Sequence, residues 1–203
     1  MPTILFVSVL TVLTLGSVMV GVLRNRRFRH RQELHEVFAE AHSMQVAYMN
    51  HRQFTFFGSY RGYNLRIEPV SPQPLDAAGS KDWTYFTIPV VNPNLRWFRI
   101  LKSSPELPDM DQWSVNPKAT AVQHDLGDWL GIRTNDPMFS HLILSQDVKI
   151  SIFKAFRRLP AAVLYIEDEE LVFVCPLLLT HEAGPAIFHD IVELMADIKD
   201  ELN

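Results

Sequence analysis

Several groups of histidines and carboxylates in this chain are of the residue types that bind metal ions or transfer protons. They are His35 with His42, His124 with Asp125, His181 with Glu182, and the acidic runs at 109–111 and 167–170. Such side chains act together only when the fold brings them to one site with suitable geometry. The spacing within each group is therefore the first test of whether chemistry is expected there.

In each group the spacing favours solvated side chains over a reactive site. His35 and His42 are seven residues apart, whereas paired ligands on a helix usually lie three or four apart, so we expect a solvated polar face. The segment HEAGP at 181–185 begins like the zinc motif H-E-x-x-H but lacks its second histidine. No nucleophile accompanies His124, and the acidic runs fall in a predicted loop and at a predicted hairpin tip.

The sequence signatures of common enzyme classes are absent as well. The chain contains no G-x-x-x-x-G-K-[ST] or G-x-G-x-x-G phosphate loop, no C-x-x-C and no G-x-S-x-G nucleophile elbow. Its single cysteine, Cys175, lies in the apolar segment LVFVCPLLL and is expected in the core. We therefore predict no catalytic residue, no metal site, no cofactor and no enzymatic activity.

The strongest signal in the sequence is an uncharged segment near the N-terminus. Residues 3–23 are 21 residues without Asp, Glu, Lys, Arg, His, Asn or Gln. A helix rises about 1.5 Å per residue, so this segment would span about 30 Å, the thickness of a bilayer's hydrocarbon core. A cleaved signal peptide would have a positive charge before its apolar stretch and a small-residue cleavage site, and both are missing. We predict an uncleaved transmembrane anchor at 1–23.

Five arginines follow the anchor within eight residues: Arg24, Arg26, Arg27, Arg29 and Arg31. Basic residues beside a span stay on the cytoplasmic side of the membrane. We therefore expect a single-pass protein of the bacterial inner membrane, with a periplasmic N-terminus and a cytoplasmic C-terminal domain. The same arginines can bind anionic lipid headgroups, at about 1 kcal/mol per basic side chain.

The charge of the remaining chain argues against a nucleic-acid partner. The whole chain has 19 Lys and Arg and 23 Asp and Glu, and no acidic residue precedes Glu33. Without the five arginines, residues 32–203 carry 14 basic and 23 acidic side chains, a formal charge of −9. Domains that bind nucleic acid carry a basic surface instead.

Small residues in the anchor suggest contact with another membrane helix. Ser17 and Gly21 form a small-xxx-small pair next to Gly16, and such pairs let two helices approach closely. The alternative is that these residues face lipid and contact no protein. Because the anchor contains no histidine, it offers no strong ligand for haem or chlorophyll and would contribute only packing to a complex that holds them.

Beyond the anchor, hydrophobic periodicity predicts a stalk helix over 24–50 and an α+β domain over 51–203, with a mainly antiparallel sheet. The expected elements are a hairpin around Arg61-Gly62, strands at 83–91 and 95–102 joined by an Asn-Pro-Asn turn, a short helix near 124–132, a strand at 141–146, a helix at 148–159, two strands joined at Asp168-Glu169, and a C-terminal amphipathic helix at 184–203. Asp136-Pro137 is expected to cap and open a helical turn.

Two short segments carry a resemblance to a group of proteins. GSYRGYNLRI at 58–67 and NDPMF at 135–139 resemble segments of uncharacterised bacterial single-pass membrane proteins with a cytoplasmic α+β domain. Those proteins have an N-terminal span, a YRG hairpin and a D-P-x-F turn before a final β-α-β-β-α unit. The resemblance implies this architecture and implies no catalytic residues.

Aromatic residues are dense between 83 and 129, and tryptophan is enriched at protein interfaces. Core packing accounts for most of these rings. Trp97, Trp113 and Trp129 are the candidates for a partner interface, because the irregular region 103–135 could fold against a partner.

These observations favour a non-catalytic accessory subunit that packs and stabilises a larger integral-membrane complex, of the photosynthetic or respiratory type. A second hypothesis is a membrane-tethered enzyme or small-ligand sensor that uses His124, Asp125 and the aromatic residues. A third is a homo-oligomeric membrane scaffold assembled through Ser17 and Gly21.

Overall fold

The computed structural model describes residues 2–48, 54–70, 83–92, 94–102, 115–176 and 184–203. Within these ranges the helices are α1 (Pro2–Ala41), α2 (Pro137–Ile143), α3 (Gln146–Arg157) and α4 (Gly184–Glu201). The strands are β1 (Met44–Tyr48), β2 (Phe54–Tyr60), β3 (Tyr63–Val70), β4 (Trp83–Pro89), β5 (Phe98–Lys102), β6 (Thr120–Ala121), β7 (Gly131–Thr134), β8 (Ala162–Glu167) and β9 (Glu170–Cys175). They confirm an α+β fold with an antiparallel sheet and a C-terminal helix.

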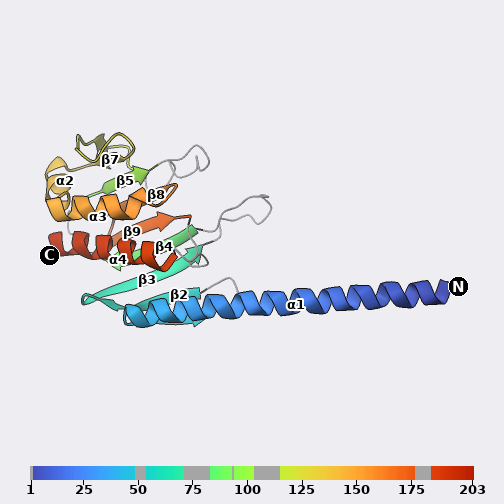
Figure 1. Cartoon of the computed structure of the whole chain (residues 1–203). Helices are drawn as coiled ribbons and strands as arrows, with labels where there is room; N and C mark the ends of the chain where they lie inside the picture. The colour runs from blue at the N-terminus through green and yellow to red at the C-terminus, as the bar shows by residue number, and fades with distance from the viewer. Residues whose placement is uncertain (1, 49–53, 71–82, 93, 103–114, 177–183) are drawn as a thin grey trace.

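Helix α1 is one continuous helix of 40 residues that projects from the domain as a rod, with the N-terminus at its far end (Figure 1). The prediction that this helix reaches residue 50 is wrong. It ends at Ala41, Ser43 adopts a positive φ of 53°, and Met44–Tyr48 forms edge strand β1. Met44 is buried while Gln45 and Ala47 are exposed, so the segment follows the two-residue period of a strand.

Side chains of α1 are described only from Val18 onward, apart from three of the arginines. Among the residues that the structure describes in this way, no helix is both long and apolar enough to cross a membrane. The uncharged residues 3–17 lie outside that description.

The described strands form one sheet in the order β1-β2-β3-β4-β9-β8-β5-β7-β6. The hairpins at Arg61-Gly62 and Asp168-Glu169 are confirmed. The strands predicted near 83–91 and 95–102 are confirmed as β4 and β5, but they are not neighbours in the sheet, because the β8–β9 hairpin lies between them. Residues 171–174 are all buried, as expected of a central strand covered on both faces.

Three helical segments cover one face of the sheet: α3, α4 and the end of α1 (Figure 1). Phe188 of α4 is fully buried, and its ring lies 5.6 Å from that of Phe38 in α1 and 4.8 Å from that of Phe86 in β4. These rings join the last turns of α1 to the core. Trp83, Val163 and Val172 belong to a smaller cluster of buried apolar residues on the opposite face.

Of three predictions for the chain around α2, one is correct and two are wrong. Asp136 caps α2 as predicted, since its Oδ1 accepts hydrogen bonds from the backbone N–H groups of Met138 (3.0 Å) and Phe139 (3.3 Å). The predicted strand at 141–146 is instead the end of α2 and the cap of α3, because that capped start propagates a helix. Residues 124–130 form bends and turns rather than a helix, and β7 follows them.

Candidate functional site

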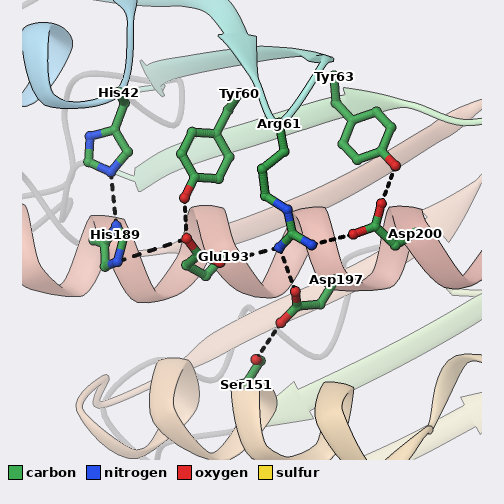
Figure 2. A network of polar contacts seen from close by, with 9 residues as sticks. All are labelled: His42, Tyr60, Arg61, Tyr63, Ser151, His189, Glu193, Asp197 and Asp200. Atoms are coloured by element: carbon green, nitrogen blue, oxygen red, sulfur yellow. Dashed lines mark hydrogen bonds and ion pairs between the residues drawn. The ribbon is translucent and has the colours of Figure 1, made fainter.

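A network of polar side chains connects the β2–β3 hairpin to α4 (Figure 2). Arg61 and Gly62 both have positive φ angles, 50° and 84°, as a two-residue type I′ turn requires. This tight turn places Tyr60 and Tyr63 on either side of Arg61. The sequence YRGY therefore presents one guanidinium and two phenol groups to the neighbouring helix.

Helix α4 supplies three carboxylates at positions four and three residues apart, which lie on one helix face. Arg61 donates to Asp197 at 2.6 Å and to Glu193 at 3.3 Å, and it also contacts Asp200. Tyr60 donates its hydroxyl proton to Glu193, and Tyr63 donates to Asp200. We call this set of residues 60, 61, 63, 193, 197 and 200 the hairpin clasp.

The electrostatics of the hairpin clasp keep its donors protonated. Burial and the hydrogen bond to Glu193 raise the pKa of Tyr60 to about 12. The hydrogen bond to Asp197 and the neighbouring carboxylates raise the pKa of Arg61. Tyr60 and Arg61 therefore act as hydrogen-bond donors to the carboxylates of α4 near neutral pH.

Helix α3 joins the same network through one side chain. Ser151 is buried and donates its hydroxyl proton to Asp197 at 2.6 Å. Asp197 thus accepts from Arg61 on one side and from Ser151 on the other (Figure 2). The hairpin, α3 and α4 are held together at this carboxylate.

Substituting Arg61 with methionine is expected to lower the free energy of unfolding by about 1 kcal/mol, because three carboxylates on α4 lose their shared cation. Urea unfolding in detergent micelles measures the loss. The matched control is Arg66→Met on the same hairpin, since Arg66 is 63% exposed and pairs with Glu68. An equal loss in both variants would contradict the role of the hairpin clasp, and raised salt should shrink the Arg61 effect.

A histidine pair connects the end of α1 to α4 beside the hairpin clasp. His42 Nδ1 donates to the carbonyl oxygen of Phe38 at 3.0 Å, since a carbonyl can only accept. In neutral His42 the Nε2 atom is then an acceptor, and it receives the proton of His189 Nδ1 at 3.0 Å. The other nitrogen of His189 lies 4.0 Å from Glu193, which extends the chain of contacts to the hairpin clasp (Figure 2).

Acidification is expected to weaken this histidine contact. Burial lowers the pKa of His42 below its ordinary value of 6.5, and positive charge on His189 lowers it further. The unfolded chain therefore binds this proton more readily, so the contribution of His42 to stability is present above pH 6.5 and is lost as the pH falls below it. The difference in unfolding free energy between the wild type and His42→Gln should accordingly be larger at pH 7.5 than at pH 5. A difference that does not change with pH would contradict the assignment.

The sequence prediction of a solvated face for His35 and His42 is wrong. The two residues are 3% and 8% exposed. The His35 ring lies 4.2 Å from that of Phe54 and stacks at 5.8 Å on that of Tyr48, both from strands of the sheet. A spacing of seven residues places both histidines on one side of α1, and that side faces the sheet and α4.

The residues His124 and Asp125 line a separate open groove of about 810 Å³. Asp128, His141 and Lys149 are the other titratable residues in its lining. Lys149 Nζ lies 2.7 Å from Asp125 Oδ1 and lowers the pKa of that carboxyl. The Nδ1 atom of His124 is buried without a hydrogen-bond partner among the described residues. The acid–histidine pair of the sequence thus lies beside a lysine in a groove with mixed charge.

The tryptophan candidates have different environments. Trp97 is 3% exposed and lies in the fold, which corrects its assignment to a partner interface. Its backbone N–H donates to the Oδ1 atom of Asn135 at 2.7 Å, so it braces the start of α2. Trp129 is partly exposed, and Trp113 lies outside the described residues.

The membrane-related candidates lie along α1. Gly21, Arg26 and Arg29 are exposed, and a Cβ atom added at Gly21 would meet no described atom within 4 Å. The side chains of Ser17, Arg24, Arg27 and Arg31 and the surroundings of Gly16 lie outside the description. In the part of the chain that the structure covers, no three His, Cys, Asp or Glu residues are grouped to hold a metal ion.

The hairpin clasp and the histidine pair could not be assembled from sequence alone. The carboxylates at 193, 197 and 200 form a recognisable stripe on a predicted helix, and the YRG hairpin was visible as a turn. Their pairing joins residues more than 130 positions apart, for which one sequence offers no signal.

No protein-family model matches this chain, and no curated protein matches it in sequence. Among solved structures, it is similar to the crystal structure of the mycobacterial trehalose monomycolate transport factor A, TtfA. That comparison has a TM-score of 0.53 and 10% sequence identity, and it covers 87% of this chain and 94% of the other. At this identity the similarity concerns the fold alone.

Proposed function

We propose that this protein is a non-catalytic, single-pass accessory subunit of a larger integral-membrane complex. Its N-terminal helix would cross the inner membrane from the periplasm, and its α+β domain would lie on the cytoplasmic face. The arginines at 24–31 would set this orientation and contact anionic lipid headgroups.

The observation that carries the proposal is the continuity of α1. One helix runs from uncharged residues 3–23 through the arginines to Ala41 without interruption. Its last turns are fixed to the domain by the buried ring of Phe38 and by the contact of His42 with His189. An anchor joined to its domain in this way would hold the domain at a defined distance and orientation from the membrane, as a subunit with a fixed place in a complex requires.

The hairpin clasp supports a structural role. Its arginine is shared among three carboxylates, and its tyrosines hold their protons at neutral pH. The similarity in fold to a protein described as a transport factor adds a transport complex to the photosynthetic and respiratory ones suggested by the sequence.

Purification of the tagged full-length chain from native membranes tests the proposal. We expect one or a few integral-membrane proteins to co-purify in fixed ratio to the chain. A control chain with an unrelated transmembrane helix in place of residues 3–23 separates contacts made by the anchor from contacts made by the domain. Recovery of the chain with no stoichiometric partner would contradict the proposal.

The groove around His124 favours a second candidate, a membrane-tethered small-ligand sensor. It brings an imidazole, carboxylates and an ammonium group together in about 810 Å³, a volume that suits a small polar molecule. Isotope-labelled protein screened with a library of small polar compounds should then show shifts of the His124 and His141 ring signals, and a His124→Ala variant should lose the binding. A screen without shifts at these rings would remove this candidate.

A further inference from the structure

The outward side of α3 combines exposed apolar side chains with basic ones. Ile150 is 46% exposed and Phe153 is 43% exposed, whereas the other side of this helix packs into the core. Lys154 and Arg157 are exposed beside them. We call this surface the α3 face and define it by Ile150, Phe153, Lys154 and Arg157, together with Trp129 from the loop between β6 and β7.

Aromatic contacts give the α3 face a fixed shape. The rings of Trp129 and Phe153 meet edge to face at 6.1 Å, with an interplanar angle of 76°. The guanidinium of Arg157 lies 5.4 Å from the Phe153 ring centre, and the ammonium of Lys102 lies 5.2 Å from that of Trp129. Two rings are thus held between two cations. Because the rings are already ordered in the free protein, less side-chain entropy is lost when a partner binds.

A shallow groove of about 330 Å³ runs beside these rings. Leu126, Ile150 and Phe153 form its apolar lining, and the charged residues along it are Lys149, Lys154 and Asp125. The groove has room for one or two apolar side chains of a partner. Exposed apolar area framed by polar groups is typical of a docking surface.

The charge of the α3 face is opposite to that of the domain. Asp125 pairs with Lys149, and Asp190 pairs with Arg158 at 3.0 Å. Among the described residues, Lys154 and Arg157 pair with no carboxylate. These two cations stand on a chain whose residues 32–203 carry a formal charge of −9. The local charge therefore selects for an acidic partner.

The position of the α3 face favours a protein over the bilayer. Figure 1 shows α3 on the part of the domain away from the N-terminus of α1, with α4 lying between α3 and the end of α1. A membrane around residues 3–23 would therefore lie at the other end of the molecule. This placement rests on the proposed function.

We propose that the α3 face docks an acidic amphipathic segment of a protein subunit in the same membrane complex. Apolar side chains of that segment occupy the groove beside Ile150 and Phe153, and its carboxylates face Lys154 and Arg157. This mode is that of an amphipathic helix laid in a groove.

Site-specific photocrosslinking in native membranes tests the proposal. A benzophenone amino acid replaces Phe153 in the full-length chain, and the matched control replaces Phe57, which is 44% exposed. Phe57 follows buried Phe56 in β2 and so points to the opposite face of the sheet. We expect position 153 to crosslink to a peptide that is acidic and amphipathic, and position 57 not to crosslink to it.

Charge reversal provides an independent test. Lys154→Glu combined with Arg157→Glu should lower the amount of co-purified partner about tenfold. Lys118→Glu, at an exposed position in the loop before β6, should leave it unchanged. The melting temperature of each variant shows that the fold is retained.

The outcomes separate this proposal from the proposed function. If the wild type forms a complex that the double variant keeps, and position 153 does not crosslink, the proposal that the α3 face is a docking surface is wrong while the proposed function stands. Crosslinks from position 153 only to lipid, to a basic segment or to a second copy of the chain would also overturn the proposal. If the wild type forms no complex, the proposed function itself fails.

Discussion

Replacing Phe188 with alanine is expected to lower the free energy of unfolding by about 3–5 kcal/mol. The side chain is fully buried, and its ring contacts those of Phe38 and Phe86. Its loss would leave a cavity where α1, β4 and α4 meet. Urea unfolding in detergent micelles, followed by tryptophan fluorescence, measures the change.

The control for this prediction is Phe153→Ala, because Phe153 is 43% exposed. Truncation at an exposed position should cost well under half as much. The Phe188 variant should also expose the last turns of α1 to proteolysis, since Phe38 would lose its neighbour. A loss below about 1 kcal/mol in the Phe188 variant would mean that α1 is not fixed to the core through these rings.

Removal of residues 3–23 is expected to transfer the protein from the membrane fraction to the soluble fraction almost completely. The deleted segment is 21 uncharged residues, long enough to cross a bilayer, and on the proposed function the arginines that remain would provide only reversible binding to anionic lipid. Sedimentation after a carbonate wash, with and without the deletion, measures the transfer.

A second variant separates anchoring from orientation. Replacement of the five arginines at 24–31 by glutamine should leave the chain in the membrane and randomise the side on which the domain lies, because basic residues set the orientation of a span. Protease protection of the domain in sealed vesicles reports that side. If the carbonate wash removed the full-length chain from the membrane, the prediction that residues 3–23 anchor it would be contradicted.

Elements with local signals were predictable from the sequence. The Arg61-Gly62 turn, the Asp136 cap and the amphipathic stripe of α4 each depend on residues close together in the chain, and each is present in the structure.

Elements decided by distant contacts were not predictable. Met44–Tyr48 continues a helical pattern in sequence, but its pairing with Phe54–Gly58 makes it a strand. The β8–β9 hairpin lies between β4 and β5, although these two strands are close in sequence. No local rule states which of several apolar strands occupies the centre of a sheet.

The candidate site was not predictable for the same reason, because it depends on contacts between residues far apart in the sequence. His42 carries a polar side chain on a helix, and a polar face would ordinarily be solvated. It is buried because His189, 147 residues later, supplies its partner. The three carboxylates of α4 belong to the candidate site because the distant β2–β3 hairpin places Arg61 among them.

The size of the particle that contains the full-length chain, extracted from native membranes in mild detergent, tests the central claim most directly. Size-exclusion chromatography with light scattering gives the protein mass of that particle, and mass spectrometry gives its composition. We predict a particle much heavier than the 23.4 kDa chain that contains other membrane proteins. A monomer, or an assembly of this chain alone, would contradict the proposal that the protein is an accessory subunit.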